Sequence, residues 1–238
     1  NMFGLNKNVK TMAQYFKENE YYTHGDIMNE AVISPLGFDE LNVHDEHNVE
    51  MLPHHKSIIE TASTKKQNFF LFLQYSKIHT DSIVNVAKKF DDLDSEYFTE
   101  KQKEINRKQY LKSLFHAGDY KKEIMKYLED MDLLDDTIII FFSDHGTSIG
   151  EKFGEKMYGS FTYDYTILSY VCFINKKIFP VQKIDYQIRM IDVMPTILEA
   201  VSINPDNNCI KMEGLSLFPF FRPTKKPGFF TKSKLETN

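Results

Sequence analysis

The sequence has few cysteines and neither long basic runs nor long apolar runs. Its two cysteines, Cys172 and Cys209, are too few for a disulfide framework and lack zinc-site spacing, so we expect two buried thiols. No run of Lys and Arg exceeds two residues and the net charge is -5, which argues against a nucleic-acid partner. The apolar runs at 69–73 and 137–142 are strand-sized, well short of the roughly 20 residues that cross a bilayer. We therefore expect a globular protein with no membrane span in this segment.

The composition supports a substantial core. Hydrophobic residues make up 42% of the chain and aromatic residues 14%. The chain starts at Asn1 inside polar, helix-like sequence and shows no signal-peptide pattern, so its localisation cannot be read. We expect residues 1–238 to form a single catalytic domain that is truncated at the N-terminus and at the C-terminus.

Hydrophobic periodicity predicts an α/β protein. We expect the continuous apolar run at 69–75 to be a central strand covered on both faces, and the β-branched run at 137–142 to be a second. The pattern between them predicts a helix at 101–131 with core contacts at Tyr110, Leu114, Ala117, Ile124 and Leu128, and so a βαβ unit with a parallel sheet. The further expected elements are a helix at 9–19, a strand at 21–25, a loop with four histidines at 42–55, a strand at 166–174 and a helix at 192–201 capped by Asp192.

Asp144 and His145 follow directly after the strand at 137–142. Ligands of open α/β sheets bind beyond the carboxyl ends of the strands. A carboxylate beside an imidazole is a suitable half of a divalent-cation site, and Gly146 leaves room for the backbone to turn. The alternative is a turn capped by Asp144 with His145 merely exposed.

A set of motifs in consistent order resembles the sulfatase family of the alkaline phosphatase superfamily. Ser-Asp-His-Gly at 143–146 after an apolar strand, then Gly150-Glu151 and Tyr163-Asp164, is similar to that family's metal motif and its sequel. Further matches are the strand at 69–75 followed by His79, the helix from Tyr110 through 119–128 with its approach at 133–137, the segment 191–198 and the segment 214–217. Glu236-Thr237 is a short match to a C-terminal family motif.

The resemblance implies a fold, a cofactor and a set of site residues. The fold would be an alkaline-phosphatase-like sandwich with a mainly parallel sheet flanked by helices. Asp144 and His145 would bind one divalent cation, Ca²⁺ by analogy to sulfatases or else Mn²⁺, Zn²⁺ or Mg²⁺, and the cation would assist nucleophilic attack on sulfur or phosphorus. His79 would lie near the leaving group or the anion of the ester, and Lys156 would neutralise developing charge. A surface histidine and a solvated lysine are the respective alternatives.

The chain also departs from the family pattern. The segment that resembles residues 9–25 lies after the nucleophile in the family, so we expect the nucleophile to be missing here. Gly25-Asp26-Ile27-Met28 stands where many sulfatases have Gly-Lys-Trp-His, which leaves sulfate and phosphate esters, small or glycan, equally open. The alternatives to a sulfate, phosphate or phosphonate ester hydrolase are a non-catalytic binding module, and a phosphotransferase or phosphodiesterase of the same superfamily.

Overall fold

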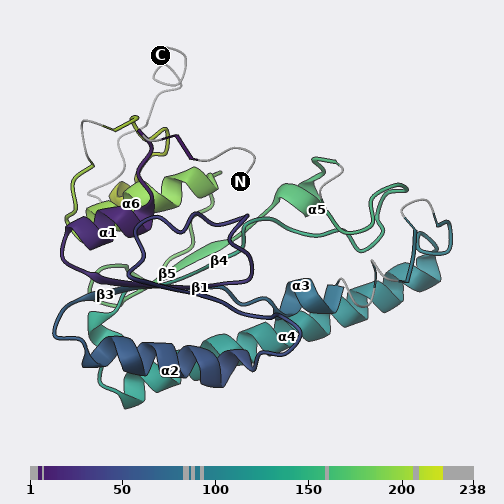
Figure 1. Ribbon diagram of the computed structural model, residues 1–238. Coiled ribbons are helices and arrows are strands. Elements are labelled where there is room, and N and C mark those ends of the chain that lie inside the picture. Colours follow the sequence, from purple (N-terminus) through teal and green to yellow (C-terminus); the bar gives the residue numbers. More distant parts are fainter. Residues whose placement is uncertain are drawn as a thin grey trace, which may run out of the picture. The chain divides into compact units, whose positions relative to one another are not determined.

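The computed structural model of the chain describes residues 5–6, 8–82, 86, 89–91, 94–158, 161–205 and 209–221. The chain divides into two compact units, Asn1–Asn175 with Asn207–Ile210, and Lys176–Asp206 with Lys211–Asn238. Figure 1 traces the helices and strands. The first unit contains strands β1 to β5 and the predicted site residues.

A parallel three-stranded sheet forms the centre of the first unit. β1 (Tyr22–Ile27) lies between β2 (Glu40–Val43) and β3 (Phe69–Leu73). In this register Asp26 is opposite Asn42 on β2 and Leu73 on β3. All six residues of β1 are buried, because strands on both sides and helices on both faces cover it. The short strand expected at 21–25 is therefore the central strand of this sheet.

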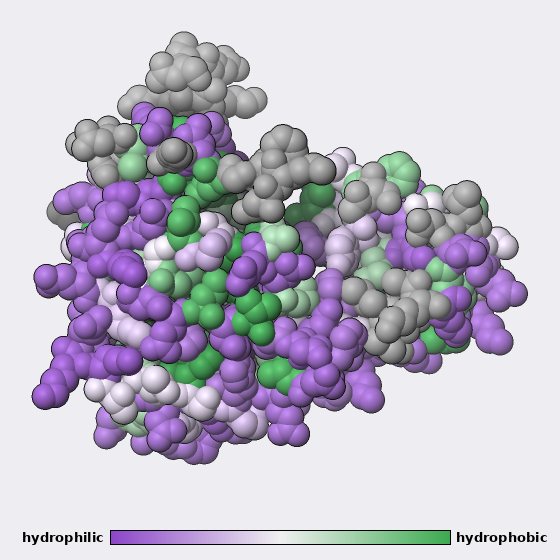
Figure 2. All heavy atoms as spheres, viewed as in Figure 1, coloured by the Kyte–Doolittle hydropathy of each residue, from purple (hydrophilic) through white to green (hydrophobic). Residues whose placement is uncertain are grey.

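Helices cover both faces of this sheet (Figure 1). α2 (Met51–Thr64), which connects β2 to β3, and α4 (Glu100–Asp130) lie on one face. α1 (Met12–Glu18) lies on the other, where the ring of Phe16 stacks on that of Phe70 with centroids 4.5 Å apart. A capping box between Thr11 and Gln14 starts α1 three residues later than the expected 9–19. Most of the surface over α2 is hydrophilic or near neutral (Figure 2), as expected for an outer helix.

The second predicted strand is β4 (Ile139–Phe142), which pairs antiparallel with β5 (Val171–Ile174). The order strand, helix, strand is confirmed, with α3 (Lys77–Ser82) and α4 between β3 and β4. Among the described residues, however, β4 has a ladder with β5 and none with β3, so the predicted parallel βαβ pairing was wrong. The two strands meet instead through side chains. Ile139 is buried with Ile124 and Leu128 of α4 in one cluster, against which Leu71 of β3 packs.

Several local predictions differ from the structure. Leu114 of α4 is 39% exposed, because the N-terminal half of α4 extends beyond the sheet (Figure 1). The expected strand at 166–174 starts only at Val171, because α5 (Asp164–Ile167) occupies its beginning and the Thr166 hydroxyl donates to the carbonyl oxygen of Tyr163. Cys172 is exposed, since alternate residues of the β5 edge strand face outward.

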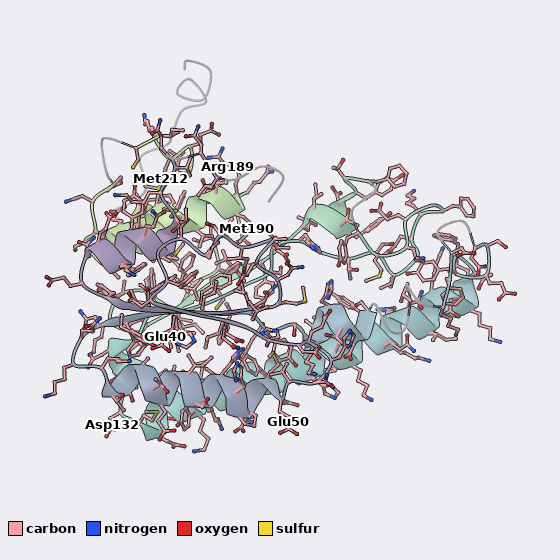
Figure 3. All side chains as sticks on the ribbon, in the orientation of Figure 1. Glu40, Glu50, Asp132, Arg189, Met190 and Met212 are labelled. Atoms are coloured by element: carbon pink, nitrogen blue, oxygen red, sulfur yellow. The ribbon has the colours of Figure 1, made fainter. Side chains whose placement is uncertain are left out.

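The second unit contains the predicted helix, α6 (Val193–Ala200), preceded by a 3₁₀ turn at Met190–Asp192 and followed by α7 (Phe218–Phe221). Asp192 immediately precedes α6, but its carboxylate accepts from the backbone amides of Arg189 (2.8 Å) and Leu215 (2.9 Å) instead of from the first turn of the helix. Arg189 is labelled in Figure 3. The family-like segments 191–198 and 214–217 are thus held together by hydrogen bonds. Glu236-Thr237 lies outside the described residues.

Where the structure describes helices, each is too short or too polar to cross a membrane.

Candidate active site

Asp144 and His145 lie where the chain leaves β4. The β4 ladder extends to Ser143, whose amide donates to the carbonyl oxygen of Tyr170 (3.1 Å). Asp144 Oδ1 then accepts from the His145 amide at 3.0 Å, and Oδ2 lies 3.6 Å from His145 Nε2. The two side chains are 79% and 40% exposed, respectively. A carboxylate and an imidazole therefore face each other at a solvent-accessible strand end.

The hydrogen bond between His145 and the next residue, Gly146, determines which imidazole nitrogen can bind a cation. Nδ1 lies 2.6 Å from the carbonyl oxygen of Gly146. A carbonyl oxygen can only accept, so Nδ1 carries the proton, and in the neutral imidazole Nε2 keeps its lone pair. Nε2 is the nitrogen near Asp144 Oδ2. The two atoms able to bind a cation therefore lie next to each other.

Gly146 is required by a close approach of the backbone to α5. Its amide donates to the carbonyl oxygen of Thr166 (2.9 Å). A Cβ at this position would lie 2.4 Å from the carbonyl oxygen of Tyr165 and 2.8 Å from that of Leu168. Both are backbone atoms that cannot rotate away, so only glycine lets the Asp144–His145 turn contact α5.

The ring of Tyr158 lies near the rings of both His145 and His79. Its centroid is 4.4 Å from that of His145 and 6.4 Å from that of His79. Burial, followed by the nearby carboxylates of Asp144 and Glu46, raises the pKa of Tyr158. The phenol therefore stays protonated at neutral pH and can donate a hydrogen bond. This ring connects α3 with the end of β4.

His79 lies in α3 and is held by an acidic side chain. Its Nδ1 is 2.8 Å from Glu46 Oε2, and its side chain is 30% exposed. The carboxylate accepts a hydrogen bond from Nδ1–H, so Nε2 is the ring nitrogen that takes no part in this contact. The structure thus places the rings of His79 and His145 near the same Tyr158 ring.

Lys156 is placed differently. Its ammonium donates a hydrogen bond to the carbonyl oxygen of Phe90, in the segment that follows α3. Its predicted role beside the ester remains a prediction.

The donor set of the Asp144–His145 pair fits part of a divalent-cation site. Carboxylate oxygen suits Ca²⁺, Mg²⁺ and Mn²⁺, and imidazole nitrogen suits Zn²⁺ and other transition metals. Within the part of the chain that the structure describes, no three His, Cys, Asp or Glu side chains converge as a complete site. Asp144 and His145 can thus supply two ligands, and further ligands would have to come from elsewhere.

A second cluster of polar residues surrounds Asp26, whose side chain is fully buried. Its carboxylate oxygens lie 2.9 Å from His44 Nδ1, 2.9 Å from His54 Nε2 and 2.8 Å from His55 Nε2. Asn42 on the neighbouring strand donates to Oδ1 at 2.5 Å. Figure 3 labels Glu40 and Glu50, which bracket the segment that carries Asn42 and His44. One carboxylate thus joins β1, β2 and α2.

The protonation states of this cluster follow from its hydrogen bonds. Burial acts to raise the pKa of Asp26, but hydrogen bonds from His55, Asn42 and His54 hold that pKa well below its usual range. Burial lowers the pKa of His55 despite the adjacent carboxylate. His55 is therefore neutral, with Nε2–H donating to Asp26 and Nδ1 accepting from the Tyr120 hydroxyl. The cluster holds a charged carboxylate in a fully hydrogen-bonded site.

Asp26, His44 and Ser76 contact one another in the sequence carboxylate, imidazole, hydroxyl, as in a hydrolytic triad. Unlike in such a triad, the hydroxyl is not accessible to a substrate. His44 Nδ1 faces Asp26, and His44 Nε2 lies 3.0 Å from Ser76 Oγ. Ser76 is only 2% exposed, and its hydroxyl lies against the Met51 sulfur at 3.8 Å. A substrate cannot reach this hydroxyl, so the arrangement serves to hold the fold together.

The expectation of a solvated loop at 42–53 was therefore wrong at both ends of this range, whereas residues 44–50 do form a loop between β2 and α2. Residues 40–43 form β2, α2 starts at Met51, and His44 and His55 are buried. One signal could have found this cluster. Asp26 directly follows the strand expected at 21–25, and a carboxylate that is buried there requires several donors, which the histidines at 44–55 offer.

Comparison with known proteins identifies the family and the fold. The sulfatase family profile matches residues 2–203. The chain is 28% identical over 174 residues to the uncharacterized sulfatase YdeN of Escherichia coli K12, which covers 71% of this chain and 30% of that protein. The phosphonate monoester hydrolase of Agrobacterium radiobacter superposes with a TM-score of 0.70 at 13% identity, covering 94% of this chain and 64% of the other.

A third comparison involves a bound ligand. A protein solved in complex with its substrate D-glucosamine-2-N,6-O-disulfate superposes with a TM-score of 0.59 at 14% identity, covering 91% of this chain and 65% of the other. The structural likenesses place the chain in the alkaline-phosphatase-like α/β fold. The chain spans less than two thirds of each of these three proteins. From the profile match over most of its length, the chain belongs to the sulfatase family.

Proposed function

We propose that this chain supplies two metal ligands and a leaving-group contact to a divalent-cation-dependent hydrolase of sulfate or phosphonate esters. Sulfatase family membership supports ester hydrolysis at the family level. The observation that carries the proposal for this chain is the pairing of Asp144 Oδ2 and His145 Nε2, 3.6 Å apart, together with the Tyr158 ring that lies near both His145 and His79.

Asp144 and His145 would hold the cation. The family resemblance favours Ca²⁺, with Mn²⁺, Zn²⁺ and Mg²⁺ as alternatives that the carboxylate and imidazole also accept. A bound cation would polarise an ester oxygen as a Lewis acid. Asp144 contributes the negative charge, and the hydrogen bond from His145 Nδ1 to Gly146 orients the ligating nitrogen.

His79 and Tyr158 would contact the ester on the other side. Nε2 of His79 is the nitrogen not used by Glu46, so it can hydrogen-bond to the leaving-group oxygen. The Tyr158 hydroxyl, kept protonated by its surroundings, can donate to an anionic oxygen. Lys156 would join them only if its ammonium left the carbonyl oxygen of Phe90.

Two structurally similar proteins and the segment 25–28 bear on the substrate class. One structurally similar protein binds a sulfated glucosamine, and another is a phosphonate monoester hydrolase. Gly25-Asp26-Ile27-Met28 carries neither the Lys nor the His with which many sulfatases contact sulfate, and Asp26 is fully buried. We propose a small-molecule or glycan ester of either acid, to be distinguished by assay.

Because the family resemblance implies a nucleophile outside residues 1–238, parallel assays of the protein encoded by the full reading frame that contains this chain test this function. Sulfate and phosphonate esters of 4-nitrophenol are offered with Ca²⁺, Mn²⁺, Zn²⁺ or Mg²⁺. We expect turnover of one ester, lost in Asp144→Asn and His145→Ala and unchanged in His116→Ala, an exposed histidine of α4. Cation-dependent turnover that survives both site substitutions would overturn the proposal. Cation binding without turnover of either ester would favour the binding-module alternative, and transfer to an added alcohol would favour a phosphotransferase.

A further inference from the structure

We propose that Glu46 is a positioning residue for His79: its carboxylate fixes the proton on Nδ1, so that Nε2 is presented to the leaving-group oxygen of the ester. This inference deepens the proposed function, on which it rests, by naming the group that orients the predicted leaving-group contact. Glu46 itself would touch neither substrate nor cation.

The contacts of Glu46 are directed at α3. Its Oε2 lies 2.8 Å from His79 Nδ1 and 2.7 Å from the Thr80 hydroxyl. Its side chain is 15% exposed, so water competes little for these hydrogen bonds. Burial acts to raise the pKa of Glu46, but hydrogen bonds from His79 and Thr80 hold that pKa below its usual range. The group that accepts from His79 is therefore an ionised carboxylate, the stronger type of acceptor.

The backbone of Glu46 is tied to the same helix. Its carbonyl oxygen accepts from the Lys77 ammonium at 3.2 Å and from the Thr80 hydroxyl at 3.5 Å. Glu46 thus contacts three residues of α3, two of them through its backbone. Such a set of contacts exceeds what an isolated surface ion pair would make, and it restricts how the carboxylate can move relative to His79.

The buried cluster around Asp26 helps to hold the segment of Glu46 against α3. His44, two residues before Glu46, binds Asp26 through Nδ1 and the Ser76 hydroxyl through Nε2. The Ser76 carbonyl oxygen accepts from the Thr80 amide at 3.0 Å. The segment that carries Glu46 and the first turn of α3 are therefore anchored to one another. The buried cluster around Asp26 thereby helps to orient His79.

The chemical consequence concerns the proton on the outer nitrogen. With Nδ1–H held by Glu46, Nε2 is the nitrogen that gains and loses a proton. The ring first takes up a proton from water on Nε2, so that both ring nitrogens are protonated. When the bond between sulfur or phosphorus and the leaving oxygen breaks, its electron pair stays on that oxygen, which takes the proton from Nε2. The imidazole is left neutral with its proton on Nδ1, and Glu46 remains a carboxylate throughout.

The tautomer of His79 can be measured directly by nitrogen-15 NMR of the imidazole rings, without metal or substrate. We assign the His79 signals from their loss in His79→Gln. In the wild type we expect the neutral ring to carry its proton on Nδ1. In Glu46→Ala we expect the ratio of Nδ1–H to Nε2–H forms to fall on the order of tenfold, the effect of losing one hydrogen bond to a charged group.

Two further variants separate orientation from a general loss of structure. Asp45→Ala removes a neighbouring exposed carboxylate that accepts from the His47 amide and Asn48, and it should leave the ratio unchanged. Glu46→Gln keeps a neutral acceptor and should restore part of the ratio. An Nε2–H tautomer in the wild type, or an unchanged ratio in Glu46→Ala with native chemical-shift dispersion, would overturn the inference.

Kinetics give a second readout once a hydrolysable ester is known. Glu46→Ala should lower kcat for an ester with an alkyl leaving group while leaving KM unchanged, and should affect a 4-nitrophenyl ester far less, since that leaving group needs no proton. Equal losses for both esters would contradict the role. If the protein hydrolyses neither ester, the proposed function fails, whereas the tautomer measurement still decides whether Glu46 positions His79.

Discussion

His55 Nε2 lies 2.8 Å from Asp26 Oδ2 in a site where both side chains are completely buried. The two residues are 29 positions apart, one at the centre of the parallel sheet and the other on α2, which covers it. A buried ionised carboxylate is tolerated only when donors satisfy it. The contact therefore makes the attachment of α2 to β1 depend on one charged group.

Asp26→Asn should be strongly destabilising. The amide that replaces Oδ1 or Oδ2 would point an N–H group at an imidazole N–H, and the remaining donors would lose their charged acceptor. We expect a loss of about 3–5 kcal/mol in the free energy of unfolding, measured by urea titration. Asp185→Asn removes an exposed carboxylate of the second unit and serves as the control. A loss no larger than that of the control would show that the cluster is not needed for folding.

Stability should decrease as the pH falls. Burial lowers the pKa of both His24 and His55, so below about pH 6.5 the unfolded chain binds protons that the folded chain does not. Unfolding is therefore favoured progressively between pH 7 and pH 5. The lowered pKa of Asp26 acts in the same direction at lower pH. Its contribution to stability is fully present above the pKa of the unfolded chain, ~3.9, and is lost as the pH falls through the lower pKa of the folded chain.

Urea midpoints measured between pH 7.5 and pH 3 check this prediction. His55→Gln should flatten the part of the curve between pH 7 and pH 5, and Asp26→Asn should flatten the part below pH 5. A wild-type midpoint that is constant from pH 7 to pH 5 would contradict the assignment of neutral buried histidines.

Two glycine-to-alanine substitutions should have opposite effects. At Gly146 a Cβ would lie 2.4 Å from a backbone oxygen of Tyr165, so the turn after β4 must shift. We expect a loss of about 1–3 kcal/mol and weaker cation binding. At Gly118, within α4, no atom lies within 4 Å of the new Cβ, and alanine should stabilise the helix by about 0.5–1 kcal/mol. Equal stability changes in thermal unfolding would contradict the close approach at Gly146.

The sequence allowed β1, β3, β4, the long helix and the place of Asp144 and His145 after β4 to be predicted because each has a local signature. A continuous apolar run identifies β3, and helical periodicity identifies α4. The Ser-Asp-His-Gly segment at 143–146 follows strand β4 directly, so its place at the strand end needs no knowledge of distant residues. The match of several short motifs in order supplied the family.

The rest depends on contacts between residues that are far apart in the chain. Asp26 and His44 meet because β1 and β2 pair in a particular register, which no local pattern specifies. The pairing of Glu46 with His79 joins residues 33 positions apart. The partner of β4 could not be predicted either, since its apolar run fits a parallel or an antiparallel neighbour equally well.

The central claim is that Asp144 and His145 bind one divalent cation together, and calorimetric titration of the purified protein with Ca²⁺ and then Mn²⁺ tests it most directly. We predict that Asp144→Asn and His145→Ala each weaken binding by at least about tenfold, as expected when a ligand is lost, while Asp185→Asn leaves the affinity unchanged. Undiminished affinity in both site variants would contradict the account.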